Sequence, residues 1–205
     1  MGLAHIDEAR ACAELEALLE GQWGNGMVPH IIYNPDEVND RSYFPQRWRW
    51  GTELAEAAAG PPTSHVTSGI TQPPVLAIAA AYIAEVGADQ ALAQSFLRRV
   101  YPKLLAFHRY LLTERDPHRE GLAFLIHPWE SGLDNSPRWQ SSLDAIVVNR
   151  GKLPEYQRLD TKLVMATQRP TNDDYDRYVY LLEVYKEHRY NHRLLFAHCP
   201  FLVQD

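Results

Sequence analysis

One apolar segment, PPVLAIAAAYIAEVG at residues 73–87, constrains the fold of this chain more than any other feature. Pro73 or Pro74 suits the first turn of a helix, and Gly87 suits its end. A helix that is apolar nearly all round must be covered on every side by other parts of the protein. The longest apolar run is only about half as long as a membrane-crossing helix requires. The segment therefore predicts a buried inner helix.

Three other segments show the one-sided apolar pattern of helices that lie against a core. The first covers residues 6–20, where Asp7 can cap the start. The second covers residues 88–115 and contains Pro102, which should kink the helix or mark a restart. The third begins at about Asn172. Their apolar stripes are Ala11, Cys12, Leu15, Leu18 and Leu19; Leu92, Phe96, Val100, Leu104, Phe107 and Leu111; and Tyr175, Val179, Leu182 and Tyr185.

The order of these segments predicts the architecture. A buried helix that alternates with amphipathic ones fits an inner layer of helices wrapped by an outer layer. The connections are long, whereas a simple four-helix bundle has short loops. Hydrophobic residues make up 45% of the chain, an ordinary value for a globular protein. We therefore expect an all-α fold in which residues 1–205 form one domain.

The connection at residues 21–72 is long and rich in Gly, Pro and Asn, yet it also carries several tryptophans and tyrosines. Disordered linkers are poor in aromatic residues. Long aromatic loops within a compact domain are more often binding loops. The connection therefore indicates a binding surface.

The overall charge excludes several classes of partner. The formal net charge is −6, with acids and bases interspersed. Nucleic acids and anionic membranes both require a basic face, so neither is expected. The N-terminal MGLAHIDEAR lacks the pattern of a signal peptide, and the two cysteines, Cys12 and Cys199, lie far apart. These features fit a reduced, cytoplasmic protein.

His188 and His192 lie four residues apart, a spacing that can hold a metal on one helix face. A third ligand is missing from the pattern, so a polar helix face is the favoured interpretation. The sequence also lacks a Gly-rich phosphate loop and a G-x-S-x-G motif. We expect neither a metal nor a cofactor.

The segment HPWESGLDNSPRW, residues 127–139, carries two carboxylates four apart, Glu130 and Asp134. Residues at this spacing on a helix lie side by side, so the two acids cannot easily flank a substrate from opposite faces. We interpret one as a chemical acid and the other as a structural partner, for instance of Arg138. An apolar ring such as that of Trp129 favours the protonated form of a neighbouring acid. A loop with a capping Asp and a salt bridge remains the alternative.

This segment resembles the acid-bearing motif of the (α/α)6-barrel glycosidases related to glycoside hydrolase family 63 and the trehalases. It is most similar to the bacterial branch that hydrolyses mannosylglycerate and glucosylglycerate. The signature E-S-G-x-D-x-S-x-R-W is matched by Glu130, Ser131, Gly132, Asp134, Ser136, Arg138 and Trp139. Segments GQWGNGMVPHIIYNP, SYFPQRW and TSGITQPPVLA resemble the cleft loops of the family, in the expected order.

The resemblance implies a fold, an activity and roles for particular residues. The fold would be about half of an (α/α)6 toroid, and the reaction would be hydrolysis of an α-glycosidic bond with inversion. Asp134 would be the general acid, Trp129 would line the sugar site, and Gln72 would bind a sugar hydroxyl. A glycerate-type aglycone would need a cation, and on charge alone we expect Arg47 or Arg49 in the aromatic loop to supply it. Weaker candidates for the cleft are Trp23, His30, Tyr33 and Trp48.

The chain departs from the family in length and in its second acid. Family members are roughly twice as long, and no residue here matches their general base, so the chain alone is expected to be inactive. One alternative is a non-catalytic half-barrel that acts as an assembly module and self-associates through its uncovered side. Another is an α-glucosidase or trehalase specificity on the same scaffold.

Overall fold

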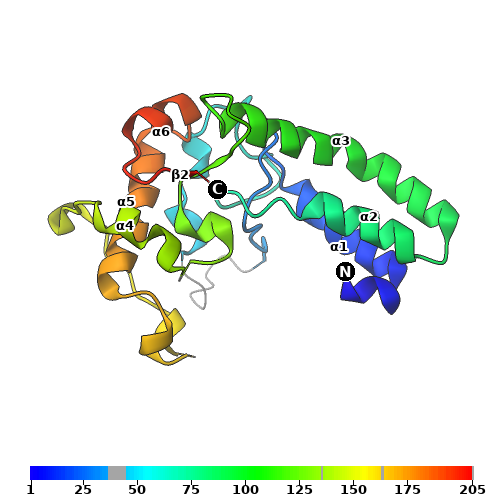
Figure 1. Ribbon diagram of the computed structural model, residues 1–205, viewed down its shortest axis with the longest axis horizontal. Coiled ribbons are helices and arrows are strands. Elements are labelled where there is room, and N and C mark those ends of the chain that lie inside the picture. Colours follow the sequence, from blue (N-terminus) through cyan, green and yellow to red (C-terminus); the bar gives the residue numbers. More distant parts are fainter. Residues whose placement is uncertain (37–44, 135, 163, 205) are drawn as a thin grey trace.

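The computed structural model describes residues 1–36, 45–134, 136–162 and 164–204, and they form a mostly helical protein, as expected (Figure 1). The helices are α1 (Glu8–Glu20), α2 (Leu76–Val86), α3 (Gln90–Glu114), α4 (Gln140–Asp144), α5 (Asn172–Glu187) and α6 (His192–His198). Short 3-10 turns cover Gly2–His5, Arg47–Arg49, Thr52–Leu54, Pro128–Ser131, Pro137–Trp139, Arg150–Lys152, Asp160–Lys162 and Ala166–Gln168. Strands β1 (Phe124–Leu125) and β2 (Val203–Gln204) pair antiparallel, with Phe124 opposite Gln204.

The elements gather in two regions. Helices α1, α2 and α3 form an arm on the right of Figure 1, while α4, α5 and α6 lie on the left, with long loops between the two groups. Helix α3 extends from the arm to the loops and reaches the left-hand group at its C-terminal end. No helix in the described parts of the chain is long and apolar enough to span a membrane.

The helix boundaries follow side chains that satisfy free backbone N–H groups. Asp7 caps α1 by accepting from Arg10 N at 2.9 Å, as predicted. The start of α5 is fixed by a capping box between Thr171 and Asp174. Helix α3 runs through Pro102 without a break, so the predicted restart does not occur. Pro102 lies on the exposed face, and the flanking core residues keep the helix in place.

Most residues of the predicted stripes lie in the core. In α1 the buried residues are Ala11, Cys12, Leu15 and Leu19, and in α3 they include Phe96, Val100, Leu104 and Phe107. All four predicted residues of α5, Tyr175, Val179, Leu182 and Tyr185, are buried. Leu92 and Leu111 are only partly buried, and Ala93 and Tyr110 contribute to the core of α3 in their place.

The prediction that α2 is covered on every side is wrong. Leu76, Ala80 and Ile83 are buried, but Ile78 is 63% exposed. Helices α1 and α3 pack against one side of α2, and no described element covers the other. The sequence shows that this helix is apolar, but it does not show whether another element covers it.

Two loops are held side by side at the base of the arm. His30 N donates to the Ile70 carbonyl at 2.9 Å, Tyr33 N donates to the Val66 carbonyl at 2.9 Å, and a β-bridge joins Ile32 to Thr67. The loop at residues 21–36 therefore has a fixed conformation against residues 66–72. Residues 42–44 of the predicted SYFPQRW cleft loop lie outside the described part of the chain.

Candidate active site

The acid motif is anchored by a carboxylate buried in the protein. The Glu130 side chain binds the Arg115 guanidinium in two places, at 2.5 Å through Oε1 and at 2.8 Å through Oε2. Its oxygens also accept from Ile126 N at 3.0 Å and from Thr71 N at 3.1 Å. Glu130 thus connects the C-terminal end of α3, the loop at 66–72 and its own turn at Pro128–Ser131.

The electrostatic setting makes Glu130 an ionised structural group. Burial alone would raise its pKa, but Arg115 and the two backbone N–H groups hold the pKa below its ordinary value. The guanidinium that binds Glu130 belongs to Arg115 and not to Arg138, which is exposed. Sequence reasoning missed Arg115 because it lies 15 residues before its partner, outside the motif.

Trp129 is positioned by a neutral histidine. The backbone N–H of Trp129 donates to Nδ1 of His127 at 3.1 Å, and the other ring nitrogen of His127 lies 3.4 Å from the Tyr178 carbonyl. Burial lowers the pKa of His127 to about 3. The Trp129 ring packs 4.4 Å from His127 and 5.5 Å from Tyr178, measured between ring centroids. The indole is therefore held between the motif and α5.

Asp134 follows a sharp turn and is only partly covered. Gly132 adopts φ +69°, a left-handed conformation that favours glycine. The Tyr178 hydroxyl donates to the backbone carbonyl of Asp134 at 3.1 Å. The Asp134 side chain is 27% exposed, and its Oδ2 lies 3.6 Å from Nη2 of Arg169. Solvent can reach this carboxyl, and a cation lies beside it.

Arg169 belongs to a polar network that the sequence reasoning did not find. Asp160 Oδ2 accepts from Arg169 Nε at 3.0 Å and from Arg158 Nη2 at 2.7 Å. Burial works against ionisation of Asp160, but the two arginines lower its pKa to about 2. The Arg158 guanidinium also lies over the Tyr175 ring, 4.0 Å from its centre. No spacing rule links residues 158–175 to the motif, since only the fold brings them together.

Gln72 and His30 lie near the acid turn. A Cβ placed on Gly132 would come within 3.5 Å of the Pro73 ring, so the turn contacts the loop that carries Gln72. The Gln72 amide donates to the Pro29 carbonyl at 3.3 Å, next to His30. Burial lowers the pKa of His30, while the nearby charges of Glu130 and Asp134 act in the opposite direction. Four of the predicted residues, Asp134, Trp129, Gln72 and His30, therefore gather on neighbouring turns.

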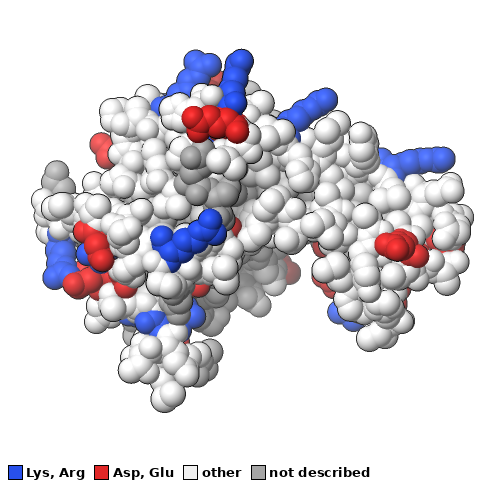
Figure 2. All heavy atoms as spheres, viewed as in Figure 1, with Lys and Arg blue, Asp and Glu red and all other residues white. Residues whose placement is uncertain are grey.

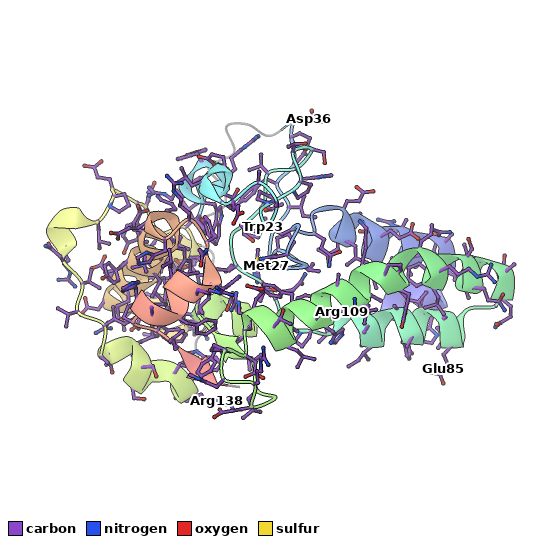
Figure 3. All side chains as sticks on the ribbon, turned by 90° about the horizontal axis from the view of Figure 1, so that it is seen from above. Trp23, Met27, Asp36, Glu85, Arg109 and Arg138 are labelled. Carbon is purple, nitrogen blue, oxygen red and sulfur yellow. The ribbon has the colours of Figure 1, made fainter. Side chains whose placement is uncertain are left out.

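Figure 3 labels two of the other predicted residues, Trp23 and Arg138. Trp23 is in the core, 4% exposed, and donates to Thr67 Oγ1 at 2.9 Å. The Tyr33 hydroxyl accepts from Trp50 Nε1 at 2.6 Å and donates to the Pro45 carbonyl at the same distance, so it fixes the loop. Trp48 is 55% exposed, and Arg138 lies at an edge of the molecule.

The two histidines at 188 and 192 do not share one polar face. His192 is buried with its ring 5.3 Å from that of Tyr110, whereas His188 stacks on His198 at 4.9 Å. Among the described residues, no three His, Cys, Asp or Glu side chains are grouped so that they could hold a metal ion.

The fold and the site together define a mostly helical protein in which one short segment carries a partly exposed acid, Asp134, and a packed indole, Trp129. The chain belongs to the mannosylglycerate hydrolase MGH1-like glycoside hydrolase family, whose model matches residues 1–205. This finding confirms the resemblance seen in the sequence.

Curated relatives are mannosylglycerate and glucosylglycerate hydrolases. The chain is 39% identical over 205 residues to mannosylglycerate hydrolase of Rubrobacter radiotolerans, covering 100% of this chain and 45% of that protein. It is 44% identical over 211 residues to glucosylglycerate hydrolase of Mycolicibacterium hassiacum, covering 100% of this chain and 46% of that protein. The chain thus spans less than half the length of the curated relatives it matches.

A solved structure shows the same fold. The family 63 mannosylglycerate hydrolase of Thermus thermophilus, crystallised with Tris and D-glycerate, superimposes with a TM-score of 0.86 at 41% identity. The match covers 98% of this chain and 45% of that enzyme. The fold class is therefore all-α, and the described helices form part of an α/α toroid, as expected.

Proposed function

We propose that this chain is the acid-bearing part of an inverting glycoside hydrolase. Its substrate is a small sugar conjugate with an α-glycosidic bond, such as mannosylglycerate or glucosylglycerate. The relatives' activities support the substrate class. The observation that carries the proposal is the position of Asp134, partly exposed on the same short segment as the fixed Trp129. The cytoplasmic location remains a prediction.

In this proposal Asp134 protonates the glycosidic oxygen as the bond breaks. Glu130 is unsuited to that role because its oxygens are already occupied by Arg115 and two backbone N–H groups, and it is buried. Asp134 has the opposite setting, since its carboxyl is accessible and its main chain is held by Tyr178. Proton transfer requires a donor within hydrogen-bond reach of the leaving oxygen, and only an accessible side chain meets that requirement.

The sugar would lie between Trp129 and the loop at 66–72. The indole offers an apolar face to the C–H side of the ring. Gln72 and His30 supply amide and imidazole groups for sugar hydroxyls, and both lie next to the acid turn. Trp23 and Tyr33 support the loop from behind instead of contacting the sugar.

The aglycone would be held by a cation near Asp134. The related Thermus enzyme was crystallised with D-glycerate, a carboxylate. Arg169 is the better candidate than Arg47 or Arg49, because its guanidinium lies 3.6 Å from the proposed acid. Arg49 instead binds the Gln46 side chain and the Glu155 carbonyl. Arg–carboxylate pairing gives both charge and geometric specificity.

Inversion needs a second carboxylate about 6.5–9.5 Å from the first, with a water between them. In the described part of the chain, two acids near Asp134 are already paired: Glu130 with Arg115, and Asp160 with Arg158 and Arg169. We propose that the base comes from the part of the relatives' length that this chain does not span. The chain by itself should then be inactive.

A chimera tests the proposal. In it, this chain replaces the matching part of the Thermus thermophilus mannosylglycerate hydrolase, and the chimera and the isolated chain are assayed on mannosylglycerate, glucosylglycerate and trehalose. Hydrolysis of a glycerate conjugate by the chimera alone, with release of the inverted anomer by NMR, supports the proposal. Preference for trehalose would favour the other specificity, and no activity in a folded chimera would favour a non-catalytic assembly module.

A further inference from the structure

A hollow of about 240 Å³ lies where four segments of the chain meet. It is lined by the loop after α1, the turn at residues 55–59, the C-terminal end of α3 and the turn between α5 and α6. Asp134, Trp129, Gln72 and His30 are not among the described residues that line it, so it is separate from the candidate active site. Pockets for drug-sized molecules have volumes of about 300–1,000 Å³, so this smaller hollow suits a ligand of a few carbon atoms.

Charged side chains of both signs line the hollow. Two are basic, Arg189 and Arg193, and two are acidic, Glu56 and Glu114. In the described part of the chain, none of the four takes part in an ion pair. Figure 2 shows basic and acidic side chains close together at the top of this view, over α6 and the C-terminal end of α3. The four charges therefore balance one another in sign without pairing directly.

His192 adds a neutral polar group to the lining. Burial lowers the pKa of His192 well below its ordinary value, so the imidazole contributes no charge near neutral pH. Its ring is 8% exposed and packs 5.3 Å from the ring of Tyr110, between centroids. Its Nδ1 is buried and has no hydrogen-bond partner among the described residues. Buried polar atoms are normally paired, so this side chain has hydrogen-bonding capacity that the described chain leaves unused.

The wall formed by the α5–α6 turn has a fixed conformation. Arg189 and Tyr190 both adopt left-handed conformations, with φ of +51° and +56°. Such strain persists only where the surroundings impose it. The Tyr190 hydroxyl donates to the Trp50 carbonyl, and the Tyr190 ring packs edge-on against Trp23 with centroids 5.5 Å apart. A Cβ on Gly69 would collide with the same ring. The hollow is therefore formed before a ligand arrives, which lowers the entropic cost of binding.

The balance of charge indicates the chemistry of the ligand. A simple anion would pair with the arginines but would leave the two glutamates unpaired, and a simple cation would do the reverse. A zwitterion satisfies both sets. The planar guanidinium of arginine matches a carboxylate, and a glutamate carboxylate accepts from an ammonium group. Ala55 and Ala59 line the same hollow with small side chains, which leave room for a short ligand.

We propose that this hollow is a binding site for a small zwitterion of the α-amino acid class. The carboxylate of the ligand pairs with Arg189 and Arg193, its ammonium group pairs with Glu56 and Glu114, and its short side chain lies against His192. The site goes beyond the proposed function, since it shares no lining residue with the proposed sugar site and requires no hydrolysis.

Three molecules of similar size test the charge requirement. L-serine carries an ammonium group and a carboxylate, L-glycerate has a hydroxyl in place of the ammonium group, and ethanolamine lacks the carboxylate. Each is titrated into the isolated chain while the Trp23 indole N–H resonance is followed by NMR, because Trp23 lines the hollow. The loss of this resonance in Trp23→Phe assigns it. We expect Kd for L-serine to be at least about tenfold lower than for either analogue, because each analogue lacks one charged hydrogen-bonding group.

Two substitutions at exposed positions test the residues. Arg193→Gln and Glu56→Gln each remove one charge from the rim, and each should raise Kd for L-serine at least about threefold. Arg10→Gln is the matched control, because Arg10 is exposed on α1 and pairs with Glu14. It should leave Kd unchanged. Thermal unfolding without ligand should be nearly the same for the parent and all three variants, since surface substitutions affect stability little. The chimera should bind L-serine with the Kd of the isolated chain.

Several results would overturn the inference. These are equal or tighter binding of L-glycerate or ethanolamine, no change in the Trp23 resonance with L-serine, and L-serine binding that neither Arg193→Gln nor Glu56→Gln weakens. Binding by the isolated chain but not by the folded chimera would show that the rest of the relatives' fold covers the hollow, and would also overturn it. None of these measurements involves hydrolysis, so such a result leaves the proposed function standing.

Discussion

Arg115 and Glu130 form a two-point ion pair whose side chains are only 1% and 0% exposed. The pair joins the end of α3 to the turn that carries Trp129, and the loop before α2 joins it through Thr71 N. Removing one partner of a buried pair leaves an uncompensated charge, which is more damaging than the pair itself is stabilising. The site is therefore built on this contact.

The first prediction concerns that pair. Arg115→Ala should lower the free energy of unfolding by about 3–5 kcal/mol, because Glu130 would lose its counter-charge in the interior. Urea denaturation of the isolated chain measures the change. Arg10→Ala is the matched control, since Arg10 pairs with Glu14 on the surface with side chains 67% and 63% exposed. A loss below about 1 kcal/mol for Arg115→Ala, the range of exposed pairs, would contradict the structural role.

Gly132 gives a second prediction. Its left-handed conformation should make Gly132→Ala cost about 1–2 kcal/mol, although the added Cβ would have room, 3.5 Å from Pro73. Gly121 has a similar φ of +81° with nothing within 4 Å of an added Cβ. Gly121→Ala should therefore lose similar stability, measured by thermal unfolding. Only Gly132→Ala should reduce hydrolysis by the chimera, since only this glycine orients the Asp134 turn.

Acid should destabilise the protein through three histidines, of which His127 and His192 are buried and His30 is half-buried. Burial lowers the pKa of His30, His127 and His192 below the ordinary 6.5. Between pH 6.5 and 4.5 the unfolded chain then binds more protons than the folded chain, so stability falls as the pH falls, by up to about 1.4 kcal/mol per pH unit for each of His127 and His192. Glu130 adds to the loss as the pH falls through about 4.5, because the unfolded chain then binds a proton there while the folded protein holds the pKa of Glu130 lower.

Replacing one of these histidines should weaken the dependence of the unfolding free energy on pH. His127→Phe lowers the overall stability because Trp129 N loses its acceptor, but the slope of unfolding free energy against pH should fall by up to about 1.4 kcal/mol per unit. Urea titrations across this pH range measure the slope. His118→Gln, at an exposed position, is the control. An unchanged slope in His127→Phe would show that this imidazole is not buried in its neutral form.

The sequence predicted a helix well where the signal comes from residues of that helix alone. Asp7 marked the start of α1, and the apolar spacing of Tyr175, Val179, Leu182 and Tyr185 identified the buried face of α5. The exposure of Ile78 could not be predicted in this way, because it depends on whether another element covers α2. The apolar pattern of a helix shows which face it can bury, but it does not show whether another element packs against that face.

In the candidate site, too, the motif predicted some residues, while contacts between distant segments could not be predicted. The motif identified Glu130 and Asp134, and the structure separates them into a buried ion pair and a partly exposed side chain. Arg115 lies beside Glu130, and Arg169 lies beside Asp134. Both arginines come from distant segments and belong to no motif that the sequence shows. Trp23 illustrates the opposite error, since an aromatic residue in a Gly-rich loop looks like a binding residue but fills the core.

The central claim is that Asp134 gives its proton to the departing glycosidic oxygen. The most direct measurement is kcat/KM for mannosylglycerate in the chimera and in its Asp134→Asn variant, which keeps the side-chain shape but removes the acidic proton. General acid catalysis contributes about 10²–10⁴-fold, so we predict a loss of at least about 100-fold, with thermal stability nearly unchanged. A variant that hydrolyses the substrate at close to the parental rate would contradict the account.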